Sequence, residues 1–143
     1  MKTKMRNLFN ILLSAILGFL GYGCETAMKY GTPTANLLLE GEVTNEEKES
    51  LHNMQIVHRD GWKDNEGIMW NDEADTIYTN AEGKYNRIYN GVFALEYHKV
   101  IVNDTAGVYQ SDSAITNATF SGGDGDWYLG NGELRVNFIL KKK

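Results

Sequence analysis

The sequence contains very little cysteine and histidine. The first scarcity argues against a disulfide-stabilised protein, and the second argues against a zinc protein. One cysteine in 143 residues, Cys24, excludes an intramolecular disulfide, so packing and strand pairing have to stabilise the fold. Three histidines give few ligands for zinc, which needs three or four convergent side chains. No nucleophile, base and acid stand together, and no strand-to-helix elbow exposes a serine. We therefore expect no cofactor and no catalytic residues.

Basic residues are scarce once the first segment is set aside. Lys2, Lys4 and Arg6 are the only charged residues before Cys24, which leaves 11 of the 14 Lys and Arg against all 19 Asp and Glu in the rest of the chain. Such an acidic chain repels the phosphates of nucleic acids and anionic lipids. Nucleic-acid binding is not expected, and membrane contact has to come from something other than a basic patch.

The N-terminal segment has the order of a secretory signal. A basic start precedes the apolar run Leu8 to Leu20, and small residues lead into Cys24. This arrangement resembles a bacterial lipoprotein signal, which implies cleavage before Cys24 and acylation of its thiol. An uncleaved signal anchor is the alternative, although the run is shorter than the roughly 20 residues that span a bilayer. We expect a signal peptide over residues 1–23 and a lipidated cysteine with a tether over residues 24–34. The lipid would anchor the protein in the bacterial cell envelope, in the outer membrane. The sequence does not distinguish the periplasmic face of that membrane from the cell surface.

Residues 35–143 alternate apolar and polar side chains with the period of β-strands. No helical period occurs outside the signal, so the pattern predicts an all-β domain, a single antiparallel β-sandwich. Residues 61–74 are expected to be a loop with one short strand. The expected strands are Leu37 to Val43, Met54 to Asp60, a hairpin of Thr76 to Thr79 with Lys84 to Asn90, a central strand Val92 to Val102, an extended segment Val108 to Phe120, and a final strand with Leu134, Val136, Phe138 and Leu140 inward.

Two short motifs resemble a known domain. Gly41-Glu42-Val43-Thr44-Asn45 and the later Asn80-Ala81-Glu82-Gly83-Lys84-Tyr85 resemble the opening strands of carboxypeptidase-regulatory-like domains, which are transthyretin-like β-sandwiches. Lys48 stands where that family usually has glycine. The resemblance implies a sandwich fold.

A second resemblance covers nearly the whole chain. Tyr30 to Ala35 and Gly125 to Leu140 are similar to the termini of the radical SAM-associated lipoproteins of Bacteroidetes. That resemblance implies an envelope location but no reaction.

Aromatic residues supply the first candidates for ligand contact. Trp62 and Trp70 lie in a polar segment and are the candidate contacts for a sugar ring or partner. Aromatic side chains also fill sandwich cores, and we assign Trp127 and Tyr85 to the core on the resemblance.

Metal sites have weaker support. Asp124 and Asp126 have the spacing of a calcium loop, with a glycine-rich turn as the favoured alternative. His52 and His58 are about 20 Å apart along a strand, at roughly 3.3 Å per residue, and cannot chelate one metal. His98 is alone among apolar neighbours, so no metal site is expected.

Three short segments resemble the Asp-Ser/Thr-apolar acceptor of O-glycosylation in Bacteroidetes envelopes. The acceptors would be Thr76, Thr105 and Ser113. The alternative is that strands and turns are simply rich in these residues. Glycans there would shield strand edges from pairing between molecules.

These observations favour a lipid-anchored envelope protein with a non-catalytic β-sandwich that binds or scaffolds envelope proteins or glycans. A gene-neighbourhood partner or covalently modified substrate of a radical SAM enzyme is the alternative, and a small envelope hydrolase is third. Saturable glycan binding, a residue-specific mass shift, or turnover that depends on a carboxylate would distinguish them.

Overall fold

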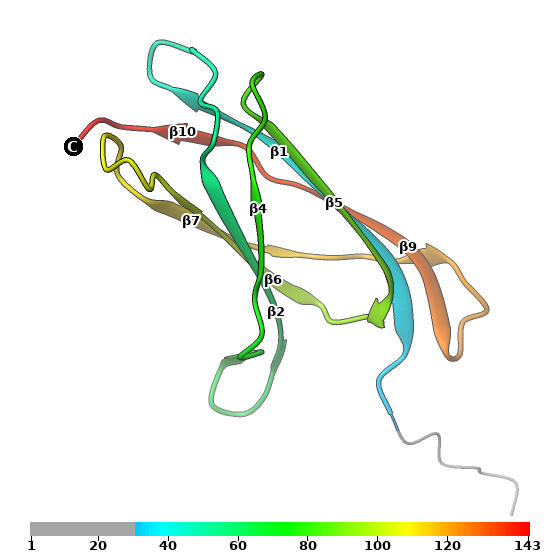
Figure 1. Ribbon diagram of the computed structural model, residues 1–143. Helices are drawn as coiled ribbons and strands as arrows, with labels where there is room; N and C mark the ends of the chain where they lie inside the picture. The colour runs from blue at the N-terminus through cyan, green and yellow to red at the C-terminus, as the bar shows by residue number, and fades with distance from the viewer. Residues whose placement is uncertain (1–30) are drawn as a thin grey trace, which may run out of the picture. The chain divides into compact units, whose positions relative to one another are not determined.

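The computed structural model describes residues 31–143, which form two five-stranded sheets packed as a β-sandwich (Figure 1). The predicted all-β sandwich is confirmed. Cys24 and the rest of the segment 1–30 lie outside the described residues. The strands are β1 (Thr34–Asn45), β2 (Gln55–Lys63), β3 (Ile68–Trp70), β4 (Asp75–Tyr78), β5 (Lys84–Phe93), β6 (Tyr97–Asn103), β7 (Asp112–Asn117), β8 (Ser121–Gly122), β9 (Tyr128–Arg135) and β10 (Phe138–Leu140).

The first sheet is built around β1. Strand β5 pairs with it antiparallel, whereas β9 and β10 pair with it in parallel, and β8 continues the sheet beyond β9. The two parallel pairings depart from the expected antiparallel pattern. The chain crosses from the second sheet to the first between β7 and β8, and after the antiparallel β8–β9 turn it runs in the same direction as β1.

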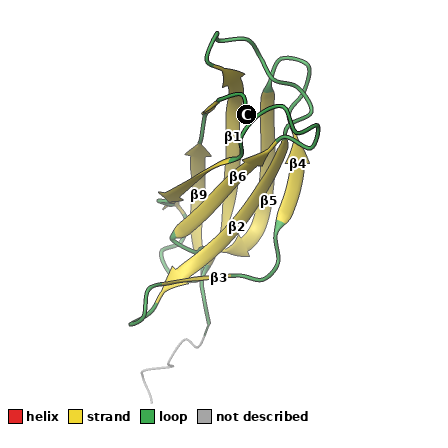
Figure 2. Ribbon diagram, turned by 90° about the vertical axis from the view of Figure 1, so that its left-hand side faces the viewer, coloured by secondary structure: helices red, strands yellow, loops and turns green. Residues whose placement is uncertain are grey.

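The second sheet is antiparallel, in the order β3, β2, β6, β7, with β4 also paired with β2. Strands β3 and β4 occupy successive lengths of the same edge of β2. Figure 2 shows this sheet in front of the strands of the first. Residues 31–143 contain no helix that is long and apolar enough to cross a membrane.

The core forms where alternating side chains of the two sheets meet. The inward alternation predicted for the first and final strands is confirmed, and Tyr85 is buried as expected. Its hydroxyl donates to the carbonyl of Val136 at 2.6 Å. Gly41 makes room for this contact, because a Cβ there would lie 1.8 Å from the same carbonyl oxygen. The main buried apolar residues are Leu37, Leu39, Val43, Leu51, Met54, Ile56, Val100, Val102, Leu134, Val136, Phe138 and Leu140.

Two predicted strand arrangements are wrong. The expected central strand Val92 to Val102 is split, since β5 ends at Phe93 in the first sheet and β6 begins at Tyr97 in the second. The apolar residues Ala94 and Leu95 made the crossover resemble a continuous buried strand. The expected hairpin also fails, because β4 pairs with β2 and β5 pairs with β1.

The second strand is longer than its turn signal indicated. Asp60-Gly61 does not end it, and β2 continues to Lys63 opposite β3. Trp70 lies across Gly61, where a Cβ would come within 2.9 Å of the indole ring. Gly61 therefore makes room for an aromatic neighbour instead of forming a turn.

The sandwich has two distinct ends. We call the end where β1 begins the tether end; it also carries the β2–β3 turn and the crossover from β5 to β6. The opposite end, called the far end, carries the β1–β2, β4–β5 and β6–β7 turns and the C-terminus (Figure 1). The candidate site lies in the half of the interior nearer the tether end.

Candidate functional site: a polar relay beside a pocket

The interior turns polar toward the tether end. On β2 the inward face runs from Ile56 to His58, and on β6 it runs from Val102 and Val100 to His98. Both histidines are buried. Because β2 and β6 are neighbours, the two imidazoles stack, with ring centroids 5.2 Å apart. The interpretation of His98 as an isolated histidine is wrong.

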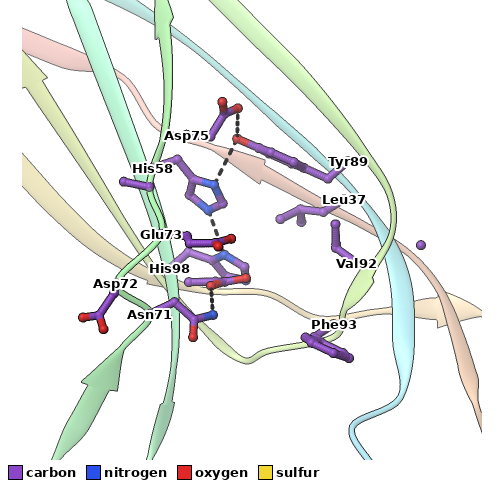
Figure 3. A pocket seen from close by; sticks show the side chains of 13 residues that line it. Leu37, His58, Asn71, Asp72, Glu73, Asp75, Tyr89, Val92, Phe93 and His98 are labelled. Carbon is purple, nitrogen blue, oxygen red and sulfur yellow. Dashed lines mark hydrogen bonds between the residues drawn. The ribbon is translucent and has the colours of Figure 1, made fainter.

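A chain of hydrogen bonds links four side chains from four strands (Figure 3). The Tyr89 hydroxyl donates to Asp75 Oδ2 at 2.9 Å and lies 3.1 Å from His58 Nδ1. His58 Nε2 lies 3.0 Å from His98 Nδ1, and His98 Nε2 lies 3.0 Å from the carbonyl oxygen of Leu95. We call Asp75, Tyr89, His58 and His98 the relay; it connects both sheets.

The number of protons that the relay needs limits its charge state. Its two ends, the Asp75 carboxylate and the Leu95 carbonyl, are acceptors only, so the four contacts need four protons. One neutral tyrosine and two neutral histidines supply three. With both imidazoles neutral, one contact therefore lacks a proton, and the relay can take up one more proton with every contact satisfied.

Burial opposes that extra proton. Desolvation, followed by repulsion from His98, lowers the pKa of His58 to about 4, against the weaker attraction of Asp60 and Asp75. Desolvation also lowers the pKa of His98, although the Leu95 carbonyl and Asp60 act in the other direction. Burial and the bond to Asp75 raise the pKa of Tyr89. At neutral pH the two imidazoles are therefore uncharged.

The relay forms one wall of a pocket of about 710 Å³. Figure 3 shows Leu37, Val92 and Phe93 on one side of it and the polar side chains of Asn71, Asp72 and Glu73 on the other. The pocket thus has an apolar wall facing a wall of hydrogen-bonding groups.

The polar wall is held by bonds to neighbouring strands. The Asn71 side chain donates to Asp60 Oδ1, and its backbone amide donates to the Asp60 carbonyl at 2.9 Å. Arg87 Nε lies 3.0 Å from Asp75 Oδ2. These bonds fix the segment between β3 and β4 against β2 and β5.

A second pocket of about 650 Å³ adjoins the first, since Asn71 and Phe93 line both. Trp62 lines this second pocket, together with Thr32 at the start of the domain. Trp62 therefore lies beside a cavity, as expected of a ligand contact, but ligand contact itself stays a prediction.

The two candidate tryptophans do not form one platform. Trp62 is paired with Met69, whereas Trp70 is paired with Gly61, so the two indoles project from opposite faces of the β2–β3 hairpin. The predicted core position of Trp127 is wrong, because 41% of this residue is exposed.

The candidate calcium loop forms a turn. Asp124 Oδ1 accepts hydrogen bonds from the backbone amides of Asp126, Trp127 and Tyr128, at 2.8 to 3.2 Å. Within residues 31–143, no three His, Cys, Asp or Glu side chains are placed to hold a metal ion.

The three candidate glycosylation acceptors are all exposed. Thr76 lies on edge strand β4, Ser113 on edge strand β7, and Thr105 in the turn between β6 and β7. The Asp104 carboxylate before Thr105 accepts backbone amides of Ala106, Val108 and Tyr109. Modification of these positions stays a prediction.

Sequence reasoning missed the relay, although one signal was present. His58 and His98 each continue the inward face of a strand, two positions from a buried aliphatic residue. Alternation therefore assigns both to the interior. Only the pairing of β2 with β6, separated by some forty residues, brings them together.

Comparisons with known proteins leave the family open. No family model and no curated protein matches the chain, so the resemblance to radical SAM-associated lipoproteins stays a prediction. Among solved structures, 3-chlorocatechol 1,2-dioxygenase from Rhodococcus opacus 1CP is 17% identical with a TM-score of 0.47, over 81% of this chain and 63% of that one. Chlorocatechol 1,2-dioxygenase from Pseudomonas putida is 11% identical with a TM-score of 0.46, over 80% and 68% respectively. At these values no activity or residue role is carried over to this chain.

Proposed function

We propose that the protein is a lipid-anchored envelope protein whose β-sandwich is a non-catalytic module that binds a glycan in the relay pocket. The observation that carries this proposal is the two-sided lining of the 710 Å³ pocket. Ligand pockets combine apolar walls with a few placed polar groups. A sugar ring has an apolar CH face and a rim of hydroxyls, which match Leu37, Val92 and Phe93 on one side and the amide and carboxylates on the other.

The bonding of the relay supports binding over catalysis. Each of the four imidazole nitrogens of His58 and His98 lies within 3.1 Å of another protein atom, which occupies the position that a substrate proton would take, and the Tyr89 hydroxyl lies between Asp75 and His58. A general base needs a free lone pair within reach of substrate. Carboxylates in the pocket also disfavour an anionic ligand, so the glycan is neutral.

The test is calorimetric titration of the detergent-solubilised lipoprotein with neutral oligosaccharides of hexose and N-acetylhexosamine. Asp72→Asn with Glu73→Gln removes two charged acceptors from the pocket and should weaken binding about tenfold or more. The matched control, Glu46→Gln with Glu47→Gln, changes two exposed acids at the far end and should leave affinity unchanged. Absence of saturable binding, or equal effects of the two double variants, would contradict the proposal.

A further inference from the structure

Exposed tryptophan and phenylalanine side chains gather at the tether end, whereas the exposed Tyr78 lies at the far end. Of the nine large apolar residues exposed in residues 31–143, the three that are Trp or Phe all lie there: Trp62, Phe93 and Trp127, with exposed fractions of 44%, 61% and 41%. Met69, 44% exposed, is the cross-strand partner of Trp62 and shares its face. The far end and the sheet faces expose no Trp or Phe to this degree.

These four side chains surround the point where the chain enters the domain. The Thr34 amide donates to the Trp127 carbonyl at 2.8 Å, and Thr34 is the cross-strand partner of Phe93. Phe93 and Trp62 line the 650 Å³ pocket together with Thr32. We call Trp62, Met69, Phe93 and Trp127 the aromatic rim.

The length of chain before the domain limits its distance from a lipid anchor. Thr32 is eight residue steps after Cys24, and at 3.3 to 3.6 Å per step these span at most about 29 Å. An acylated Cys24 therefore keeps the entry point within about that distance of the bilayer. The aromatic rim, which lies beside this entry point, is then within reach of the lipid.

We propose that the aromatic rim contacts the headgroup layer of the membrane and orients the sandwich with its tether end down. This proposal rests on the lipid anchor in the proposed function. Tryptophan favours the boundary between lipid and water, where its apolar body and polar N–H are both satisfied. Phe93 belongs to the rim and lines both pockets, which puts both pockets beside the proposed membrane contact.

Charge at the tether end selects the kind of lipid. Exposed Asp64, Glu66 and Glu96 lie near the rim beside Lys63, so the local balance is acidic. Such a surface is repelled by anionic headgroups. The contact is therefore with a zwitterionic surface such as phosphatidylethanolamine, through aromatic residues and not through a basic patch.

The three tryptophans make this testable, because residues 1–30 contain none. The full acylated chain is reconstituted into phosphatidylethanolamine vesicles whose acyl chains are brominated close to the headgroup, and tryptophan emission is recorded. We expect quenching relative to unbrominated vesicles. Trp62→Phe and Trp127→Phe should each reduce the quenched fraction, whereas Trp70→Phe, on the opposite face of the hairpin, should not.

A far-end probe supplies the matched control. Ile139 is exposed next to the C-terminus, and Ile139→Trp should add emission that brominated lipid leaves unquenched. Unquenched wild-type emission from chains that float with the vesicles would overturn the rim contact while leaving the anchor intact; so would equal quenching of Ile139→Trp or a requirement for anionic lipid. Chains that do not float and lack acyl mass on Cys24 would overturn the anchor, and with it this proposal.

Discussion

The two halves of the sandwich interior follow different rules, although the same strands build both. Toward the far end, β1, β2, β6 and β10 contribute a closely packed aliphatic core around Val43, Ile56, Val102 and Leu140. Toward the tether end, β2 and β6 contribute His58 and His98 at the equivalent inward positions, and the space beside them is a pocket. One half stabilises the fold, and the other leaves room for a ligand.

The difference lies in how each half satisfies its buried groups. Aliphatic side chains gain by leaving water and need no hydrogen-bond partner, so they can pack against one another in the far half. Buried imidazoles need polar partners, and the relay supplies them only by joining residues of β2, β4, β5 and β6. The stability of the polar half therefore depends more strictly on the exact positions of its side chains than that of the apolar half does.

The largest expected effect comes from opening a cavity in the apolar half. Leu140→Ala removes a side chain that is 1% exposed and should lower the free energy of unfolding by about 2 to 5 kcal/mol. The adjacent Ile139→Ala, at an exposed position, should change it by less than about 0.5 kcal/mol. Urea denaturation measures both. Similar losses for the two variants would mean that the far half is not the tightly packed core described above.

Acid should weaken the polar half selectively. Above pH 6.5 His58 is neutral in both the folded and unfolded states. As the pH falls toward 4, the unfolded chain binds a proton that the folded chain does not, so the free energy of unfolding decreases. The shift from 6.5 to about 4 corresponds to a loss of about 3 kcal/mol, and the lowered pKa of His98 acts in the same direction.

Denaturation curves between pH 7.5 and 4 measure this loss. His58→Gln should flatten the dependence between pH 6.5 and 4, and the exposed His52→Gln is the matched control. If His58→Gln had the same pH dependence as the unsubstituted protein, the relay would not be the site of the acid sensitivity.

The smallest expected effect concerns a turn at the far end. Lys48 has φ of 63°, in the left-handed region where a side chain is disfavoured, and it stands where the resembling domain family has glycine. Lys48→Gly should therefore raise the free energy of unfolding by up to about 1 kcal/mol. Glu47→Gly, at a neighbouring position without positive φ, should not stabilise. A thermal denaturation scan that ranks the two variants equally would contradict this account of the turn.

The sequence predicts the strands better than it predicts their partners. Alternation around Leu39 and Phe138 assigns inward faces correctly, because a buried face imposes a period of two on any strand. The same alternation places Val92 to Val102 in one strand, since a crossover of Ala94 and Leu95 has the composition of a buried strand. Local pattern does not record which sheet a strand joins.

For the candidate site, the sequence alone determined which residues face inward and that Trp62 lies in a polar segment. Tertiary structure decided that His58, His98, Tyr89 and Asp75 meet, that Trp62 and Trp70 point to opposite faces, and that Trp127 is exposed. The reason is physical. Burial of a face depends on near neighbours in the chain, whereas the pairing of β2 with β6 and the packing of β5 against them join residues distant in sequence.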